Sequence, residues 1–228
     1  MQSTKPNKER LRRRLMTAAI ISLLMIGWAL IDLYGPWSAD LRHFDAAEIA
    51  RLETDMWRAY YDKRKLRLYW LLVTKLRSQN GFPFLRANLN AYRAARAAIV
   101  FKDGKNRNDY QQALPYLRNY FSALCKIGHL PSNADRIAEL ELEWWIVHRE
   151  QDHYGEEALI NAIASSTAEL YGLPAEDLHD YAAARAAAMR QRDACALAVG
   201  GVKESQWQEI EAKLLTAYRA LVDKLNHS

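Results

Sequence analysis

The sequence predicts an all-α protein in which one N-terminal transmembrane helix precedes an irregular antiparallel bundle of about six to seven helices. Three observations predict this class. The chain begins with a basic segment that runs into a long apolar stretch. Every long segment after residue 44 has apolar residues at helical spacing, and none shows the sustained alternation typical of strands. Loops of about two to eight residues between such helices favour antiparallel neighbours.

The apolar stretch predicts a membrane anchor. Seventeen uncharged residues, from Leu15 to Ile31, follow a head that contains six lysines and arginines. At a rise of about 1.5 Å per residue they form about 25 Å of helix, and two further apolar residues extend it after Asp32. We therefore expect a basic cytoplasmic tail (residues 1–14), a transmembrane helix (15–34), a linker (35–44) and an extracytoplasmic all-helical domain (45–228).

The distribution of basic residues around this span predicts its orientation. Six lysines and arginines precede the span, whereas only Arg42 and Arg51 follow within twenty residues of its end. The positive-inside rule then places the N-terminus in the cytoplasm and the domain in the periplasm or outside the cell, with the anchor in a bacterial inner membrane. The alternative is a cleaved signal peptide with a small-x-small site at Gly27-Trp28-Ala29. The apolar run continues past that site, which favours an uncleaved anchor.

Charge also bears on the partners of the domain. The net charge is +5, and residues 1–14 account for all of it, since the remaining chain holds 26 basic and 26 acidic groups. A domain without net charge is not typical of nucleic-acid-binding proteins. The expected partners are the lipid bilayer, through residues 15–34, and another membrane or periplasmic protein. No second apolar span of about eighteen residues is present, so a single copy is not expected to form a channel.

The two cysteines do not form a recognisable redox or metal motif. Cys125 and Cys195 are seventy positions apart, and each has apolar neighbours. One disulfide is compatible with an oxidising compartment, but buried free thiols are the more frequent reason for such cysteines. The sequence leaves both states open.

Capping residues and glycines predict the helix boundaries. Asp45 with Glu48 forms a capping box that opens the first helix of the domain, which runs to Asn80 unless it breaks near residues 62–65. Ser205 with Gln208 is predicted to cap the last helix. The other helices are expected at residues 83–101, 109–127, 132–154, 156–171 and 174–199.

Two segments carry most of the distinctive composition of the domain, Leu52–Tyr61 and Glu139–Arg149. Together they resemble the signature of uncharacterised bacterial single-pass membrane proteins with a helical soluble domain. The resemblance implies an anchored helical domain and no activity.

Ionisable residues beside apolar stripes predict a polar network in the core. Glu53 and Glu141 each border such a stripe, and burying a carboxylate without a partner is costly. One interpretation is an active-site carboxylate with His148 as acid or base, but a satisfied network between helices is more frequent. The candidate network comprises Glu53, Arg58, Arg96, Glu141, His148 and Arg149. The candidate interface or core aromatics are Trp57, Tyr60, Trp144 and Trp145.

A Glu-x-x-His pattern occurs twice, at Glu150/His153 and at Glu176/His179. Bundles that hold two iron ions use two such motifs together with carboxylates from two other helices. Here both motifs lie at predicted helix ends, away from the middle of a bundle where such ligands project inward. We therefore expect no metal site and no cofactor.

No motif names a reaction. The sequence has no nucleophile elbow, phosphate-binding glycine loop, zinc-protease motif or calcium loop. The favoured hypothesis is a membrane-anchored interaction or scaffold protein, a subunit or accessory factor of a membrane-associated assembly. The alternative is a carboxylate/His metal-dependent oxidase of the di-iron type in the bundle core.

Overall fold

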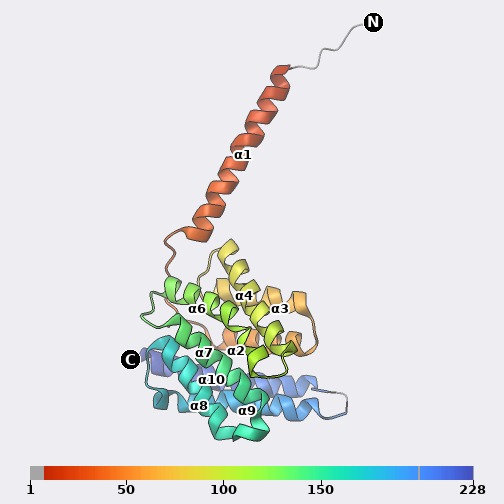
Figure 1. Cartoon of the computed structure of the whole chain (residues 1–228), viewed down its shortest axis with the longest axis vertical. Coiled ribbons are helices and arrows are strands. Elements are labelled where there is room, and N and C mark those ends of the chain that lie inside the picture. Colours follow the sequence, from red (N-terminus) through yellow and green to blue (C-terminus); the bar gives the residue numbers. More distant parts are fainter. Residues whose placement is uncertain (1–7, 200, 228) are drawn as a thin grey trace.

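The computed structural model describes residues 8–199 and 201–227, and this part of the chain is all-helical without strands (Figure 1). The all-α class is therefore confirmed. The helices are α1 (Lys8–Tyr34), α2 (Ala46–Tyr61), α3 (Lys65–Ser78), α4 (Phe84–Asp103), α5 (Arg107–Gln111), α6 (Leu114–Gly128), α7 (Ala134–Arg149), α8 (Gln151–Tyr171), η1 (Ala175–Leu178), α9 (His179–Ala196) and α10 (Glu204–Asn226).

Helix α1 projects away from the rest of the molecule (Figure 1). Its apolar side chains are exposed along its length, and it is long and apolar enough to cross a membrane. A signal sequence near the N-terminus meets the same criterion of length and apolar composition. Twenty-seven residues of helix span about 40 Å, which exceeds the hydrocarbon thickness of a bilayer.

The end of α1 is held by the first turn of α4. The buried carboxylate of Asp32 accepts a hydrogen bond from the backbone N–H of Arg86 at 3.0 Å. In return, the Arg86 guanidinium donates to the carbonyl oxygens of Leu33, at 2.6 and 3.1 Å, and of Gly35, at 3.0 Å. These bonds occupy carbonyls that the end of a helix leaves without partners. We call this arrangement the anchor clasp.

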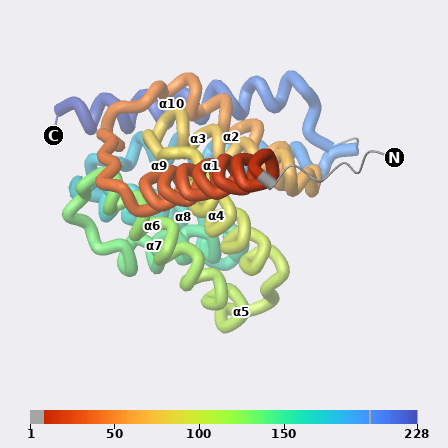
Figure 2. The backbone as a smooth tube through the Cα atoms, turned by 90° about the horizontal axis from the view of Figure 1, so that it is seen from above, coloured from red at the N-terminus to blue at the C-terminus, as the bar shows by residue number. Residues whose placement is uncertain are grey.

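Eight helices form a closed ring of contacts below α1. Each of α2, α3, α4, α6, α7, α8, α9 and α10 packs against the next, and α10 packs against α2. The short helix α5 connects α4 to α6 and contacts α7 as well. In the view from above, α1 lies over the middle of this arrangement (Figure 2).

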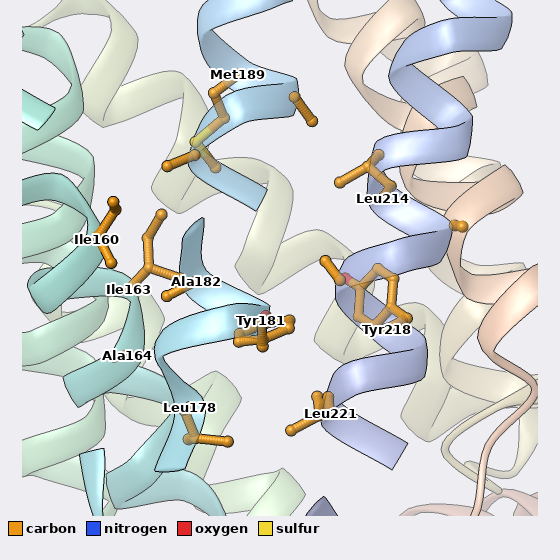
Figure 3. Close-up of a cluster of buried hydrophobic side chains, with 14 of the residues drawn as sticks. Ile160, Ile163, Ala164, Leu178, Tyr181, Ala182, Met189, Leu214, Tyr218 and Leu221 are labelled. Atoms are coloured by element: carbon orange, nitrogen blue, oxygen red, sulfur yellow. The ribbon is translucent and has the colours of Figure 1, made fainter. Parts of the chain in front are cut away.

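The ring has two apolar clusters, one on each side. The first lies among α2, α8, η1, α9 and α10, and Figure 3 shows its side chains from α8, α9 and α10 turned toward one another. The second joins α3, α4, α5, α6 and α7 with Leu41 of the linker. Helix α7 contributes to both clusters, through Val147 to the first and Ile146 to the second.

More helices are present than the six to seven expected. The predicted helix from Asp45 to Asn80 is divided, because Lys63 adopts a left-handed backbone conformation with φ of 58°. The predicted helix at residues 109–127 is divided before Pro115, which lies in the first turn of α6, where its missing N–H is tolerated.

The Asp45 cap was predicted correctly, but its reciprocal partner was not: the Asp45 backbone N–H donates to the Gln79 side-chain oxygen at 3.0 Å instead of to Glu48. The predicted cap of the last helix was wrong. Asp45 caps α2 by accepting hydrogen bonds from two backbone N–H groups. The N-cap of the last helix is Lys203, two residues before the predicted Ser205, and the Gln206 side chain accepts a hydrogen bond from the Lys203 backbone N–H. Both cysteines are free and half-buried, which agrees with the preference for thiols.

Candidate ligand-binding cavity

The ring surrounds an open pocket of about 620 Å³, which we call the cavity. All eight ring helices contribute side chains to its wall, together with Leu41 and Phe44 of the linker and Asn80. This volume lies within the range of about 300–1,000 Å³ that is usual for small-molecule sites. Among the lining residues, only Tyr61 and Arg149 are exposed.

A buried ion pair connects three helices across the wall. Glu53 of α2 is only 4% exposed and accepts a hydrogen bond from the Arg185 guanidinium of α9 at 2.5 Å. The Tyr218 hydroxyl of α10 donates to the other carboxylate oxygen of Glu53. Arg185 also donates to the Tyr181 hydroxyl at 3.0 Å and lies 5.2 Å from the ring centroid of Trp144. The pair therefore joins α2, α9 and α10 and reaches α7.

The electrostatics of this pair favour the charged forms. Burial alone would raise the pKa of Glu53, but the charges of Arg185 and Lys75 and the hydrogen bonds from Tyr218 and Arg185 hold this pKa below its ordinary value. Burial alone would lower the pKa of Arg185, yet Glu53 keeps it well above the usual range. Burial and the Glu53 carboxylate both raise the pKa of the Tyr218 hydroxyl, which remains a donor.

Lys75 of α3 is the cation of the wall without a close acceptor. It lines the cavity, and the described part of the chain offers it no carboxylate within 4.0 Å and no hydrogen bond for its side chain. Burial lowers its pKa, while the charges of Glu53 and Glu141 oppose that shift. The Lys75 ammonium therefore has three N–H donors that a ligand is able to use.

Glu141 of α7 has neutral partners. Its two carboxylate oxygens accept from the indole N–H of Trp145, at 3.1 Å, and from the Ser166 hydroxyl of α8, at 3.0 Å. Within the described ranges, no lysine, arginine or histidine lies within 4.0 Å of this carboxylate. These bonds tie α7 to α8 and place a negative charge on the cavity wall.

A second polar cluster lies on the cavity wall beside Tyr61. The His148 ring nitrogen Nε2 lies 2.9 Å from the Asp193 carboxylate, which also pairs with Arg192. The Arg192 guanidinium lies over the Tyr61 ring, with its central carbon 3.3 Å from the ring centroid. This cluster joins α7, α9 and the end of α2.

The predicted network is therefore only partly correct in its partners. Glu53 is buried, but Arg58 pairs with Glu204 near the surface, at 3.0 Å, and does not contact Glu53. Arg96 lies over the Tyr116 ring, and Arg149 donates to the carbonyl oxygens of Phe101 and Gly104. None of these three arginines pairs with Glu53, because each lies on a helix face that turns toward another partner, which the spacing within one helix does not reveal.

The predicted aromatic set lines the cavity. Trp57, Tyr60, Trp144 and Trp145 are all half-buried, and all four belong to its wall. They are core residues around an internal space and do not form an outer surface. Aromatic side chains of this kind supply large apolar contact areas for a small ligand.

The Glu-x-x-His residues do not form a ligand set. In the described residues, no group of three or more histidines, cysteines, aspartates and glutamates is placed to hold a metal ion. Glu150 lies at the junction of α7 and α8, and His153 packs against the Tyr154 ring. Glu176 lies in η1 and His179 begins α9, beside Asp180 at 3.8 Å.

Sequence reasoning missed Lys75, Arg185 and Tyr218. A signal exists for two of them. Lys75 shares its helix face with Leu68 and Leu72, and Arg185 is a single cation in a run of alanines. Both patterns place a charge where only apolar or small side chains surround it. Neither pattern reveals which helix supplies the partner.

No protein-family model matches the sequence, and searches of curated proteins and of solved structures found no match. The resemblance to uncharacterised bacterial single-pass membrane proteins therefore stays a prediction. The function of the cavity has to be inferred from its own geometry.

Proposed function

We propose that this protein is a membrane-anchored receptor for a small organic anion, which it holds in the central cavity. One observation supports this function above the others: eight helices line a pocket of about 620 Å³ whose wall carries both aromatic and charged groups. Large concave sites with a few polar groups in an apolar wall are the usual form of small-molecule sites. The ring itself would be the antiparallel bundle predicted from the short loops.

The charges of the wall favour an anion. Four cations line the cavity, namely Lys75, Arg149, Arg185 and Arg192, against three carboxylates, namely Glu53, Glu141 and Asp193. One negative charge on the ligand would balance this set when His148 is neutral. Since Arg185 and Arg192 already have carboxylate partners, Lys75 is the group that would receive the anion. The aromatic wall would hold an apolar body.

We predict that Lys75→Met weakens binding of an aromatic anion about 10- to 150-fold. A hydrogen bond to a charged group contributes about 1.5–3 kcal/mol, which corresponds to this range. The probe is naphthalene-2-sulfonate, titrated into the full-length protein in lipid nanodiscs by isothermal titration calorimetry. Methionine keeps the length and apolar stem of the lysine, so the change removes mainly the charge.

The matched control is Lys126→Met, which removes an exposed cation of α6 that is not part of the wall. It should bind the probe as the parent does. Equal affinity in the parent and in Lys75→Met would contradict the role of Lys75. Absence of saturable binding, together with native mass spectra of freshly purified protein without a bound small molecule, would contradict the receptor function.

The structure lends less support to the two functions favoured by the sequence. An interaction or scaffold protein needs surface anchors, whereas the aromatic candidates line the cavity. A di-iron oxidase needs clustered carboxylates and histidines, whereas Glu53 is engaged by Arg185 and Tyr218. Binding of a partner protein is therefore proposed only for the outer surface of the ring.

We further propose that α1 spans a bacterial inner membrane once, with the N-terminus in the cytoplasm and the ring in the periplasm or outside the cell. The six-to-two excess of basic residues before the span supports this orientation. Alkaline phosphatase fused after residue 227 should be active in bacterial cells, and green fluorescent protein fused there through the Sec pathway should not fluoresce. Fluorescence without phosphatase activity would contradict the orientation.

A further inference from the structure

The α3–α4 hairpin, residues 63–102, has a strongly segregated charge. Its forty residues include ten lysines and arginines and no aspartate or glutamate. The basic residues are Lys63, Arg64, Lys65, Arg67, Lys75, Arg77, Arg86, Arg93, Arg96 and Lys102. The zero net charge after residue 14 hides this basic segment, because the other segments together carry an acidic excess of the same size. A net charge of zero for the domain is therefore compatible with a strongly basic face on this hairpin.

Exposed apolar side chains lie on the same hairpin. Leu66 is 79% exposed and Trp70 is 55% exposed, and they lie one turn apart on α3. On α4, the exposed apolar residues are Phe84, Leu89 and Tyr92. Among the described residues beyond α1 and the linker, the only others of this kind are Tyr61, Leu197 and Val199. We call the five apolar side chains, with the exposed cations Lys63, Lys65 and Arg77, the hairpin face.

The hairpin face lies close to the anchor. The first turn of α4 holds the end of α1 through the anchor clasp. Figure 1 shows α3 and α4 in the half of the domain nearer to α1, with α8 and α9 in the farther half. Helix α1 also contacts α4 directly. A membrane crossed by α1 would therefore run beside this hairpin.

We propose that the hairpin face docks on the anionic headgroups of the bilayer that α1 spans. Tryptophan and tyrosine are enriched at the membrane–water interface, and lysine and arginine are attracted to anionic lipids within about a Debye length of the surface. The face combines both kinds of side chain, and it continues from the point where the anchor leaves the bilayer. The inference rests on the proposed membrane span and is independent of the ligand in the cavity.

The free cations identify the residues to change. Lys63 and Lys65 are exposed, and within the described part of the chain their side chains have no ion-pair or hydrogen-bond partner. Arg67 pairs with Asp55 at 3.5 Å, and Arg93 donates to the Asn119 carbonyl oxygen, so changing those would disturb contacts between helices. Lys63→Glu with Lys65→Glu therefore reverses charge on the face with least effect on the ring.

The test uses full-length protein in nanodiscs of phosphatidylcholine, with or without phosphatidylglycerol, doped with a phospholipid that carries a diazirine in its headgroup. After illumination, mass spectrometry maps the lipid adducts on the chain. We expect adducts on α1 in both discs, and adducts on residues 63–92 that increase several-fold with phosphatidylglycerol. Lys63→Glu/Lys65→Glu should reduce the hairpin adducts several-fold, and Trp70→Ala should reduce them as well.

The matched control is Lys213→Glu with Arg219→Glu on α10, which is separated from α3 by α2 in the ring. It makes the same change of charge and should leave the hairpin adducts unchanged. Circular dichroism and thermal melts confirm that each variant is folded.

Three results would overturn the proposal. Lipid adducts that are confined to α1 in both kinds of nanodisc would show that the hairpin face does not contact the lipid headgroups. Crosslinks between copies, independent of lipid charge, would assign the face to a second copy of the chain. Protection of residues 63–92 by an oligonucleotide, and not by phosphatidylglycerol, would assign it to nucleic acid. Absence of adducts on α1 would instead contradict the membrane span.

Discussion

Replacing Glu53 with alanine is expected to lower the free energy of unfolding by about 3–5 kcal/mol, because it leaves the buried Arg185 guanidinium without its carboxylate. Both partners are largely buried, with side chains that are 5% and 16% exposed, so solvent screens the pair little. The change also removes the acceptor of the Tyr218 hydroxyl. Chemical denaturation of the full-length protein in mild detergent, followed by circular dichroism, measures the effect.

Two controls separate the pair from general effects of truncation. Glu204→Ala removes another carboxylate that pairs with an arginine of α2, but Glu204 is 69% exposed, so we expect a loss of at most about 1 kcal/mol. Glu53→Met combined with Arg185→Met should recover part of the stability, because no charge is then stranded. A Glu53→Ala melt that matches the parent would contradict the structural role of the pair.

The same pair predicts a dependence on pH. The pKa of Glu53 is lower in the folded protein than the ordinary value of 4.5, which approximates the unfolded chain. The stabilisation is therefore fully present above about pH 4.5, and it is lost as the pH falls through the lower folded pKa. The melting temperature of the parent should decrease more steeply below pH 4.5 than that of Glu53→Gln. Parallel curves would contradict the lowered pKa.

Replacing Arg86 with alanine is expected to release α1 from the domain. The guanidinium donates three hydrogen bonds to the carbonyls of Leu33 and Gly35, and a hydrogen bond from a charged group contributes about 1.5–3 kcal/mol. Loss of even one such contribution raises the population with an open anchor clasp by about 10- to 150-fold. Hydrogen exchange of residues 31–37 in nanodiscs should accelerate accordingly, while exchange in α7 and α8 stays unchanged.

Arg93→Ala is the matched control for the anchor clasp, since Arg93 belongs to the same helix and donates to Asn90 and to the Asn119 carbonyl oxygen. It should leave exchange at residues 31–37 as in the parent. Asp32→Asn retains an acceptor oxygen for the Arg86 backbone N–H and should have a smaller effect than Arg86→Ala. Equal exchange in the parent and in Arg86→Ala would show that other contacts hold α1.

Local signals made most of the fold predictable. Helical spacing, the Asp45 cap and the apolar run that forms α1 are properties of short segments, and each lies where it was expected. The break at Lys63 was an open alternative, because nothing in four consecutive charged residues requires a left-handed conformation. The closed ring was not predictable, since the contact of α10 with α2 depends on shape complementarity between distant segments.

The sequence allowed us to predict which carboxylate of the candidate site is buried, but it did not reveal which residues pair with it. Glu53 was identified because a carboxylate in an apolar stripe needs compensation, and that logic holds in the structure. Its partner Arg185 was missed because 132 positions separate the two residues. Lys75 was missed because a lysine is more often a solvated residue of a helix face than a group that lines a cavity.

The closure of the ring by α10 has a consequence for how the protein is made. Glu53 and Tyr218 are 165 residues apart, and translation at about 5–20 residues per second separates their synthesis by about 8–33 s. During that interval the apolar face of α2 that includes Ile49 and Ala50 has no α10 to cover it. The contact that closes the ring can therefore form only after α10 has been synthesised, and until then this face of α2 has to be covered in another way.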